Sequence, residues 1–256
     1  MERAAVLERL SVQRTPIRWR TATVRETVAE TAHARTIVLD AGDWPGHVAG
    51  QHLDLRLTAQ DGYQAQRSYS IASAPEAATV AITVERIDDG EVSPYLTDEL
   101  RAGDELELRG PVGGHFTWSV GDGGPLLLVA GGSGVVPLMA MLRHLAAHDG
   151  APVDARLLLS ARRWDDVLYR TELEALAGRP GIQVAYTLTR ERPADWAGYV
   201  RRVDADMLAA VGPPPTARPR VFVCGPTAFV EQAADALIDL GHPPGAVRTE
   251  RFGPTG

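Results

Sequence analysis

The spacing of apolar and polar side chains changes near the middle of the chain. Residues 19–118 form short segments of alternating apolar and polar positions, separated by glycine, proline and Asp-Gly turns. Short strands at this spacing are typical of an antiparallel barrel or sandwich. The segments predicted as strands are Thr21–Val28, Arg35–Asp40, His52–Thr58, Arg67–Ala72, Val80–Glu85 and Glu105–Arg109.

Beyond residue 121, apolar runs alternate with longer segments of helical spacing. This alternation predicts a doubly wound α/β fold, a parallel sheet with helices on both faces. The predicted strands are Leu126–Ala130, Ala155–Ser160, Gln183–Leu188 and Arg220–Cys224; the predicted helices are Val135–His148, Leu168–Ala177, Ala205–Val211 and Thr227–Leu240.

The stretch Gly121–Pro125 separates the two patterns and reads as a joint between domains. We therefore predict an N-terminal arm at residues 1–18, an antiparallel β-barrel domain at 19–120 and an α/β domain at 121–256. Within the barrel domain, Pro94–Leu100 is predicted as a short helix that Ser93 caps at its N-terminus.

Composition limits the classes of function. The 256 residues are 45% hydrophobic with a formal net charge of −7, which is typical of a folded globular protein and argues against nucleic acid as the main partner. The longest apolar runs, such as Leu126–Ala130, are far shorter than the roughly 20 residues of a membrane span. Because the N-terminus lacks a signal-like apolar core, we expect a cytoplasmic protein that does not act in a membrane.

The stretch Arg67-Ser68-Tyr69-Ser70 carries the first candidate chemistry. On a strand, Arg67 and Tyr69 face the same way. A guanidinium can make paired hydrogen bonds to a pyrophosphate, and a tyrosine ring can pack against a planar redox cofactor. Taken alone, these two side chains could equally be an exposed strand charge and a half-buried aromatic residue.

Two later motifs add a second nucleotide site. Gly131–Pro137 follows an apolar strand and opens a predicted helix, where glycines and free N–H groups can hold a pyrophosphate. Cys224-Gly225-Pro226 ends another strand of the same sheet, at the carboxyl edge where open α/β sheets bind ligands. Together with the arginine motif, this order indicates two bound nucleotides.

The three motifs together resemble the ferredoxin–NADP reductase superfamily, from about Trp19 to the C-terminus. The resemblance implies a stand-alone reductase without an iron–sulfur domain, which takes hydride from NAD(P)H onto FAD. It implies catalytic roles for Ser70, Cys224, Glu250 and Phe252, with the largest effect on rate at Ser70. On the flavin side it implies contacts from Arg67, Tyr69, Ser70, Glu85, Gly90, Val92, Ser93 and Phe252; on the nucleotide side, from Gly131, Gly132, Gly134, Pro137, Ser160, Arg162, Arg163, Arg190, Cys224, Gly225 and Pro226.

The choice of nucleotide depends on three arginines. Arg162, Arg163 and Arg190 follow the second and third predicted strands of the α/β domain, where members of the family that prefer NADPH hold its 2′-phosphate. Cationic side chains suit a phosphate better than a bare ribose, so we expect NADPH to be favoured. Alternatively, these arginines are solvated or pair with Asp165 and Asp166.

A single cysteine cannot bind a plant-type iron–sulfur centre, which needs four thiolates. We therefore expect the electrons to leave to a separate acceptor, such as ferredoxin or an oxygenase component. One alternative is a reductase of free flavin or of small diffusible acceptors, and another is a regulatory module that binds the cofactors without catalysis. His144 and His148, four residues apart on a predicted helix, lack an evident third ligand and are expected on an exposed helix surface rather than at a metal.

Overall fold

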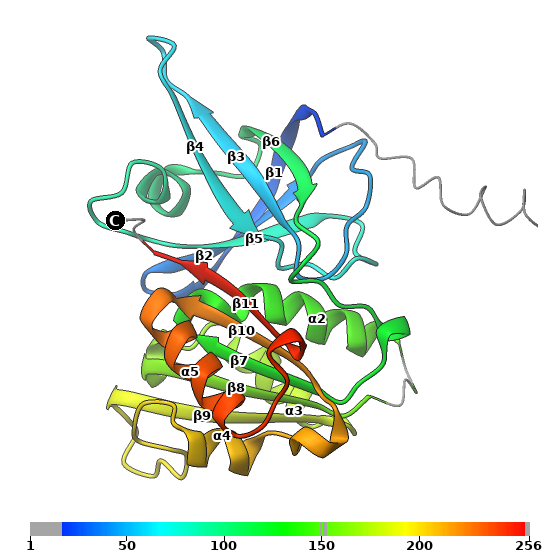
Figure 1. Cartoon of the computed structure of the whole chain (residues 1–256). Helices are drawn as coiled ribbons and strands as arrows, with labels where there is room; N and C mark the ends of the chain where they lie inside the picture. The colour runs from blue at the N-terminus through cyan, green and yellow to red at the C-terminus, as the bar shows by residue number, and fades with distance from the viewer. Residues whose placement is uncertain (1–16, 149, 151–152, 254–256) are drawn as a thin grey trace, which may run out of the picture.

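The computed structural model describes residues 17–148, 150 and 153–253. Two sheets divide the molecule, an antiparallel one from the first half of the chain and a parallel one from the second (Figure 1). This arrangement confirms the predicted barrel and doubly wound α/β classes. Most of the predicted N-terminal arm lies outside the described residues. Among the described residues, no helix combines the length and apolar character that crossing a membrane requires.

The antiparallel sheet has six strands in the order β4-β3-β6-β1-β2-β5. A bridge between Ile71 and Ile82, with a hydrogen bond from Ala72 N to Ala81 O, joins the two edge strands and closes the barrel. Alternate side chains of the strands fill its interior, as the period of two requires. The strands are β1 (Trp19–Thr31), β2 (Ala34–Asp40), β3 (His52–Thr58), β4 (Gln64–Ser70), β5 (Val80–Glu85) and β6 (Glu105–Val112).

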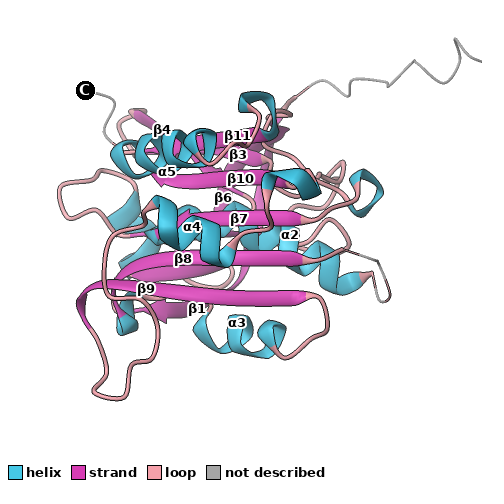
Figure 2. Ribbon diagram, turned by 60° about the horizontal axis from the view of Figure 1, so that its bottom comes forward, coloured by secondary structure: helices cyan, strands magenta, loops and turns pink. Residues whose placement is uncertain are grey.

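The parallel sheet has five strands in the order β11-β10-β7-β8-β9, which Figure 2 shows side by side. One apolar cluster packs its first face against α2 and α3, and a second packs the other face against α4 and α5. The elements are β7 (Leu126–Gly131), α2 (Val135–Ala147), β8 (Ala155–Arg163), α3 (Arg170–Ala177), β9 (Ile182–Glu191), α4 (Ala205–Val211), β10 (Arg220–Pro226), α5 (Thr227–Asp239) and β11 (Val247–Phe252).

Buried polar contacts join the two domains. The Tyr169 hydroxyl, at the start of α3, bonds Thr83 on β5, and Thr83 bonds Thr36 on β2 at 2.8 Å. Arg143 on α2 donates to the Ala72 carbonyl at 2.7 Å while its other nitrogens bind Glu172 at 2.8 and 2.6 Å. These bonds lie at a largely apolar boundary, so they fix the angle at which the barrel meets the α/β domain.

The brief helix predicted at Pro94–Leu100 is present as a π-helical turn at Tyr95–Glu99. The predicted cap is wrong, because Ser93 does not cap it. The Ser93 hydroxyl instead accepts from Ile87 N at 3.0 Å, because the chain must first close the turn that precedes this segment. The strand β11 was not predicted, since its residues are half-buried or exposed and show no apolar run.

Candidate cofactor-binding site

A cleft of about 480 Å³ lies between the barrel and the carboxyl ends of the parallel strands. Its position at the carboxyl ends of the strands agrees with the rule that open α/β sheets bind ligands where the strand order reverses. The flavin-side motifs Arg67–Ser70 and Gly90–Ser93, and the pair Cys224 and Glu250, are not among its lining residues. Its lining includes seven residues that the sequence singled out, namely Glu85, Gly131, Gly132, Ser160, Arg162, Pro226 and Phe252.

The glycine loop serves two different purposes. Gly132 is exposed with φ of +55°, and a Cβ there would meet open space, so this residue presents backbone to the cleft. Gly134 is buried, and a Cβ there would lie 2.1 Å from the Cys224 carbonyl oxygen. Gly134 therefore lets α2 start directly against β10. Pro137 is likewise buried within α2 and does not line the cleft.

The redox residues of the α/β domain sit on neighbouring strands. Cys224 on β10 pairs in register with Glu250 on β11, so both side chains share one face of the sheet. Burial raises the pKa of the Cys224 thiol well above its usual value, with a further contribution from the nearby Glu250 charge. A thiol held neutral in this way is a poor nucleophile, which suits a positioning role rather than covalent chemistry.

Glu250 is the most perturbed carboxyl group of this site. Burial raises its pKa to about 7, and its Oε2 atom is buried without a hydrogen-bond partner among the described residues. The other oxygen, Oε1, lies 3.9 Å from Nδ1 of His52 on barrel strand β3. Since β3 pairs His52 with Ser70 of β4, the barrel and the parallel sheet bring Ser70 and Glu250 to the same region.

The flavin-side motif lies along β4. Arg67 and Tyr69 pair with the buried Leu55 and Leu53, so they share one face, whereas Ser70 faces the other way with His52. The Tyr69 ring packs on the barrel core, and burial raises its pKa to about 12. The Arg67 side chain is 53% exposed, and its guanidinium is therefore open to an anionic ligand.

The turn at Gly90–Ser93 closes tightly on itself. Gly90 N donates to Ile87 O at 2.8 Å, and a Cβ on Gly90 would lie 2.9 Å from that same oxygen. Val92 is buried in the barrel core and offers almost no surface to a ligand. The side chain of Glu91 points to Arg67, with 3.7 Å between Oε2 and Nη2.

The arginines after β8 and β9 have different surroundings. Arg162 lines the cleft beside Ser160 and Asp166. Arg163 pairs with Glu191 at 3.3 Å, a partner that the sequence did not suggest, and Arg190 is exposed. Of the two aspartates, Asp165 pairs with Arg170 at 3.5 Å.

Sequence reasoning missed three residues of the site. Ser133 donates to Glu85 at 2.7 Å and so ties the glycine loop to the end of β5. Phe229 lines the cleft, with its ring against Gly131 and Gly225. His52 belongs to no motif in the sequence. Its pairing with Ser70 across strands β3 and β4 is what places it near the predicted site.

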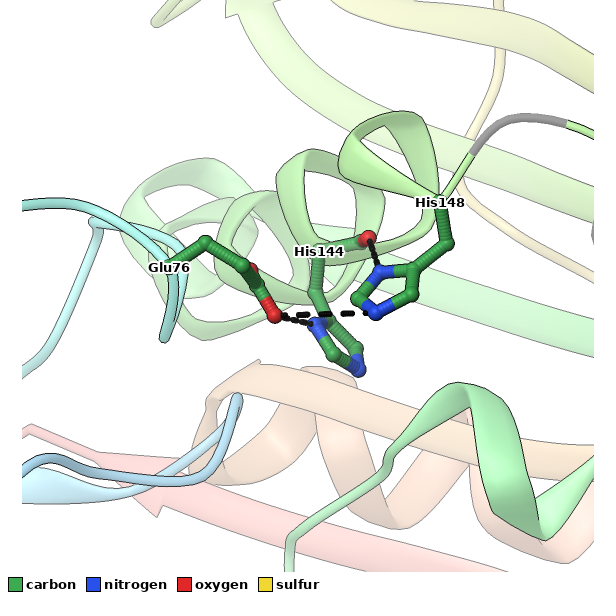
Figure 3. Close-up of side chains that lie close together, drawn as sticks. All are labelled: Glu76, His144 and His148. Atoms are coloured by element: carbon green, nitrogen blue, oxygen red, sulfur yellow. Dashed lines mark hydrogen bonds and ion pairs between the residues drawn. The ribbon is translucent and has the colours of Figure 1, made fainter.

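His144 does not lie on an exposed helix surface as expected: it is buried, 7% exposed, and a third polar group, Glu76, lies beside it. Figure 3 shows Glu76 reaching from the barrel to both histidines on α2. His144 Nε2 accepts from Val120 N at 3.2 Å, so its proton sits on Nδ1 and donates to Glu76 at 2.7 Å. A metal on Nδ1 would displace that proton and break the Val120 bond, so this geometry favours a contact between domains.

Comparison with known proteins identifies both domains. Residues 24–118 match the family model of the oxidoreductase FAD-binding domain, and residues 128–235 match that of the oxidoreductase NAD-binding domain. Ferredoxin–NADP reductase B of Sorangium cellulosum is 36% identical over 239 residues, which cover 90% of this chain and 91% of that protein. The reductase subunit of glycine betaine monooxygenase from Pseudomonas aeruginosa is 34% identical over 80% of this chain, which spans 56% of that subunit.

Solved structures show the same arrangement. The FAD/NAD-binding domain of nitric oxide dioxygenase from Vibrio cholerae has a TM-score of 0.80 at 25% identity, covering 92% of this chain and 99% of that one. A ferredoxin–NADP⁺ reductase of Neisseria gonorrhoeae with bound FAD and NADP has a TM-score of 0.77 at 21% identity, covering 91% and 98%.

The chemistry of the cleft agrees with these matches. The glycine loop opens into the cleft at a helix N-terminus, where backbone N–H groups can hold a pyrophosphate. The exposed Arg67 guanidinium, and the Cys224 thiol beside Glu250, lie outside the residues that line the cleft. The chain belongs to the ferredoxin–NADP reductase family and is an FAD-containing, NAD(P)H-dependent oxidoreductase.

Proposed function

We propose that this protein takes hydride from NADPH onto FAD and passes the electrons to a separate protein, a ferredoxin or an oxygenase component. The observation that carries the proposal is the approach of His52 and Glu250 to 3.9 Å, because His52 is the register partner of Ser70 on the neighbouring barrel strand and Glu250 is the register partner of Cys224. Residues for the two cofactors thereby meet at one place.

On the flavin side, Arg67 binds the FAD pyrophosphate and Tyr69 packs against the isoalloxazine or the ribityl chain. Ser70 donates a hydrogen bond at the atom that accepts hydride. We assign the backbone N–H groups of the Gly90–Ser93 turn to the same pyrophosphate, with Gly90 and Glu91 as its more accessible residues. FAD supplies the chemistry that accepts a hydride and releases single electrons.

On the nucleotide side, the backbone of Gly131 and Gly132 holds the pyrophosphate at the start of α2. Gly134 and Pro137 are buried and support the loop through packing. Cys224, followed by Gly225 and Pro226, positions the nicotinamide as a neutral thiol. Phe252 is 38% exposed at the end of β11 and lines the cleft, so it covers the flavin until nicotinamide takes its place.

We assign the 2′-phosphate of NADPH to Ser160, Arg162 and Arg190, with a weaker part for Arg163 because Glu191 already pairs with it. The position of Asp166 in the cleft argues the other way, since a carboxylate repels phosphate and can bind a ribose hydroxyl.

Kinetics with both nucleotides decide the assignment. We expect a higher kcat/KM with NADPH, and Arg162→Ala should lower it at least about tenfold through KM while leaving NADH nearly unchanged, since one charge-assisted hydrogen bond contributes about 1.5–3 kcal/mol. Arg25→Ala, which removes an exposed arginine of β1, is the matched control. A wild-type preference for NADH would contradict the assignment.

The cysteine count and the relatives both support a separate electron acceptor. The single cysteine of these 256 residues is too few for a plant-type iron–sulfur centre, which supports a separate one-electron carrier. The relatives include a ferredoxin–NADP reductase and the ferredoxin reductase component of 3-ketosteroid-9-alpha-monooxygenase, 32% identical over 242 residues. We expect NADPH-dependent reduction of an added plant-type or bacterial ferredoxin to exceed that of free flavin, and the reverse order would favour a diffusible acceptor.

A further inference from the structure

His52 and Glu250 form a contact between the domains that the family motifs do not contain. His52 comes from the first position of β3 and Glu250 from the fourth position of β11, and their Nδ1 and Oε1 atoms are 3.9 Å apart. The distance exceeds a direct hydrogen bond, so a small approach of the side chains or one bridging water completes a path for a proton. Each residue has a register partner in the proposed hydride-transfer site, Ser70 for His52 and Cys224 for Glu250.

The surroundings of this pair place one proton on it near neutral pH. Burial raises the pKa of Glu250 to about 7 and lowers the pKa of His52. The charge of Asp54 on the same strand opposes the second shift, and Asp54 is itself held by Ser68 at 2.6 Å and Arg109 at 2.8 Å. Burial thus disfavours the charged form of both groups, and their uncharged pair is a carboxylic acid beside a neutral imidazole.

His52 also connects the buried carboxyl group to solvent. Its side chain is 27% exposed, whereas Oε2 of Glu250 is fully buried without a partner among the residues described. Gly113, with φ of +94°, lies against the imidazole, and a Cβ there would come within 3.3 Å of Nδ1. The glycine therefore leaves the ring room to turn while the barrel keeps it beside Glu250.

We propose that His52 exchanges protons between solvent and the Glu250 carboxyl group during the redox cycle. The inference rests on the proposed function, in which Glu250 lies at the site of hydride transfer. Hydride carries two electrons and one proton, so a reduction by two electrons and two protons draws one more proton from solvent.

The transfer balances without an added reactant. The Glu250 O–H bond breaks as its proton moves to the redox site, and the carboxylate then takes the proton on Nδ1 of His52. The imidazole regains a proton from water at its other nitrogen. When the electrons leave to the acceptor, the protons return to solvent along the same groups, and no electron passes through either side chain.

The proposal is tested on FAD-loaded protein with two measurements. Infrared spectroscopy follows the C=O band of a protonated carboxyl group with pH, with Glu250→Gln to assign it; we expect a band that titrates near pH 7 and disappears in the variant. Anaerobic stopped-flow reduction of His52→Gln should then show a loss of about 100-fold in the rate step that depends on pH, the lower end of the range of about 10²–10⁴-fold for a positioned proton donor.

Two further results would distinguish proton transfer by His52 from a purely structural role. In His52→Ala, added imidazole bases should restore the rate in proportion to their basicity. His115→Gln, which changes an exposed histidine in the Gly113–Phe116 loop, should leave rate and pH profile unchanged. Retained FAD absorbance in each variant shows that the fold is intact.

Different outcomes would contradict the role of His52 and the proposed function. If Glu250→Gln slows reduction but His52→Gln does not, or if imidazole restores nothing, His52 is not the exchange partner and the proposed function stands. If neither variant alters reduction by NADPH, Glu250 is not at the site of hydride transfer.

Discussion

The two predicted nucleotide sites, one in each domain, are built on opposite principles. On the α/β side, backbone geometry is fixed by packing: a Cβ on Gly134 would strike the Cys224 carbonyl, and the Phe229 ring fills the space beside Gly131. On the barrel side, Arg67 is half-exposed and holds an ion pair at 3.7 Å with an equally exposed Glu91. An exposed pair of this kind contributes little to folding, so Arg67 is free to exchange Glu91 for a phosphate.

This contrast separates stability from binding. Substitution of the buried Gly134 should act on the folded state itself, because an added Cβ would strike the backbone of β10 in the parallel sheet. Substitutions of the flavin-side arginine should act on cofactor affinity alone. The two kinds of substitution therefore have different effects: the first lowers the stability of the fold, and the second lowers cofactor affinity.

Gly134→Ala should have the largest effect. The added Cβ would lie 2.1 Å from a backbone oxygen, which no side-chain rotation relieves, so we expect a loss of at least about 3 kcal/mol in the free energy of unfolding. Gly245→Ala is the control, since a Cβ there meets nothing within 4 Å, and it should stay within about 0.5 kcal/mol. Chemical denaturation measures both, and equal stabilities for the two variants would contradict the packing role.

Arg67→Ala should weaken FAD binding by about 10- to 100-fold, the loss expected for charge-assisted hydrogen bonds of about 1.5–3 kcal/mol. The free energy of unfolding of the FAD-free protein should change by less than about 0.5 kcal/mol, because its ion pair with Glu91 is exposed. Fluorescence titration with FAD gives the affinity. Undiminished FAD affinity would remove Arg67 from the flavin site.

A smaller effect should appear in the pH dependence of stability. Since burial raises the pKa of Glu250 to about 7, the folded state holds this proton more tightly than the unfolded chain does. Its stabilising contribution is complete below the ordinary carboxyl pKa and is lost as pH rises through about 7. The wild type should therefore lose stability relative to Glu250→Gln by at most about 1.4 kcal/mol per pH unit between about pH 5 and 7.

Denaturation at several pH values checks this sign. The difference between the two proteins should level off above about pH 8, where the carboxyl group is ionised in both states. A difference that is constant throughout, or that grows in favour of the wild type, would place Glu250 in water rather than in the domain boundary.

Local patterns were enough to predict much of the fold. The bounds of β3, β5 and α4 agree with the sequence prediction residue for residue. Strict alternation marks β3, a largely apolar run that ends at Glu85 marks β5, and the Asp204 cap marks the start of α4. The strand β11 was missed since it pairs with β10 across an intervening helix, and its half-exposed residues carry no period of their own.

The site was predictable only where a motif is local. Gly132 and Arg162 line the cleft as their positions after strands suggest. Contacts between distant segments left no trace in the sequence: Glu76 is 68 residues from His144, and His52 is 198 residues from Glu250 (250 − 52). The burial of His144 was mispredicted for the same reason, because its partner lies in the other domain.

The most direct test of the central claim, that residues of both domains meet at one hydride-transfer site, is anaerobic reduction of the Ser70→Ala protein by NADPH. We expect this variant to keep its FAD and its absorbance spectrum while flavin bleaching slows at least about tenfold, because the lost hydroxyl acts at the atom that accepts hydride. Bleaching at the wild-type rate would contradict the account, as would a wild-type protein whose bound flavin no reduced nicotinamide bleaches.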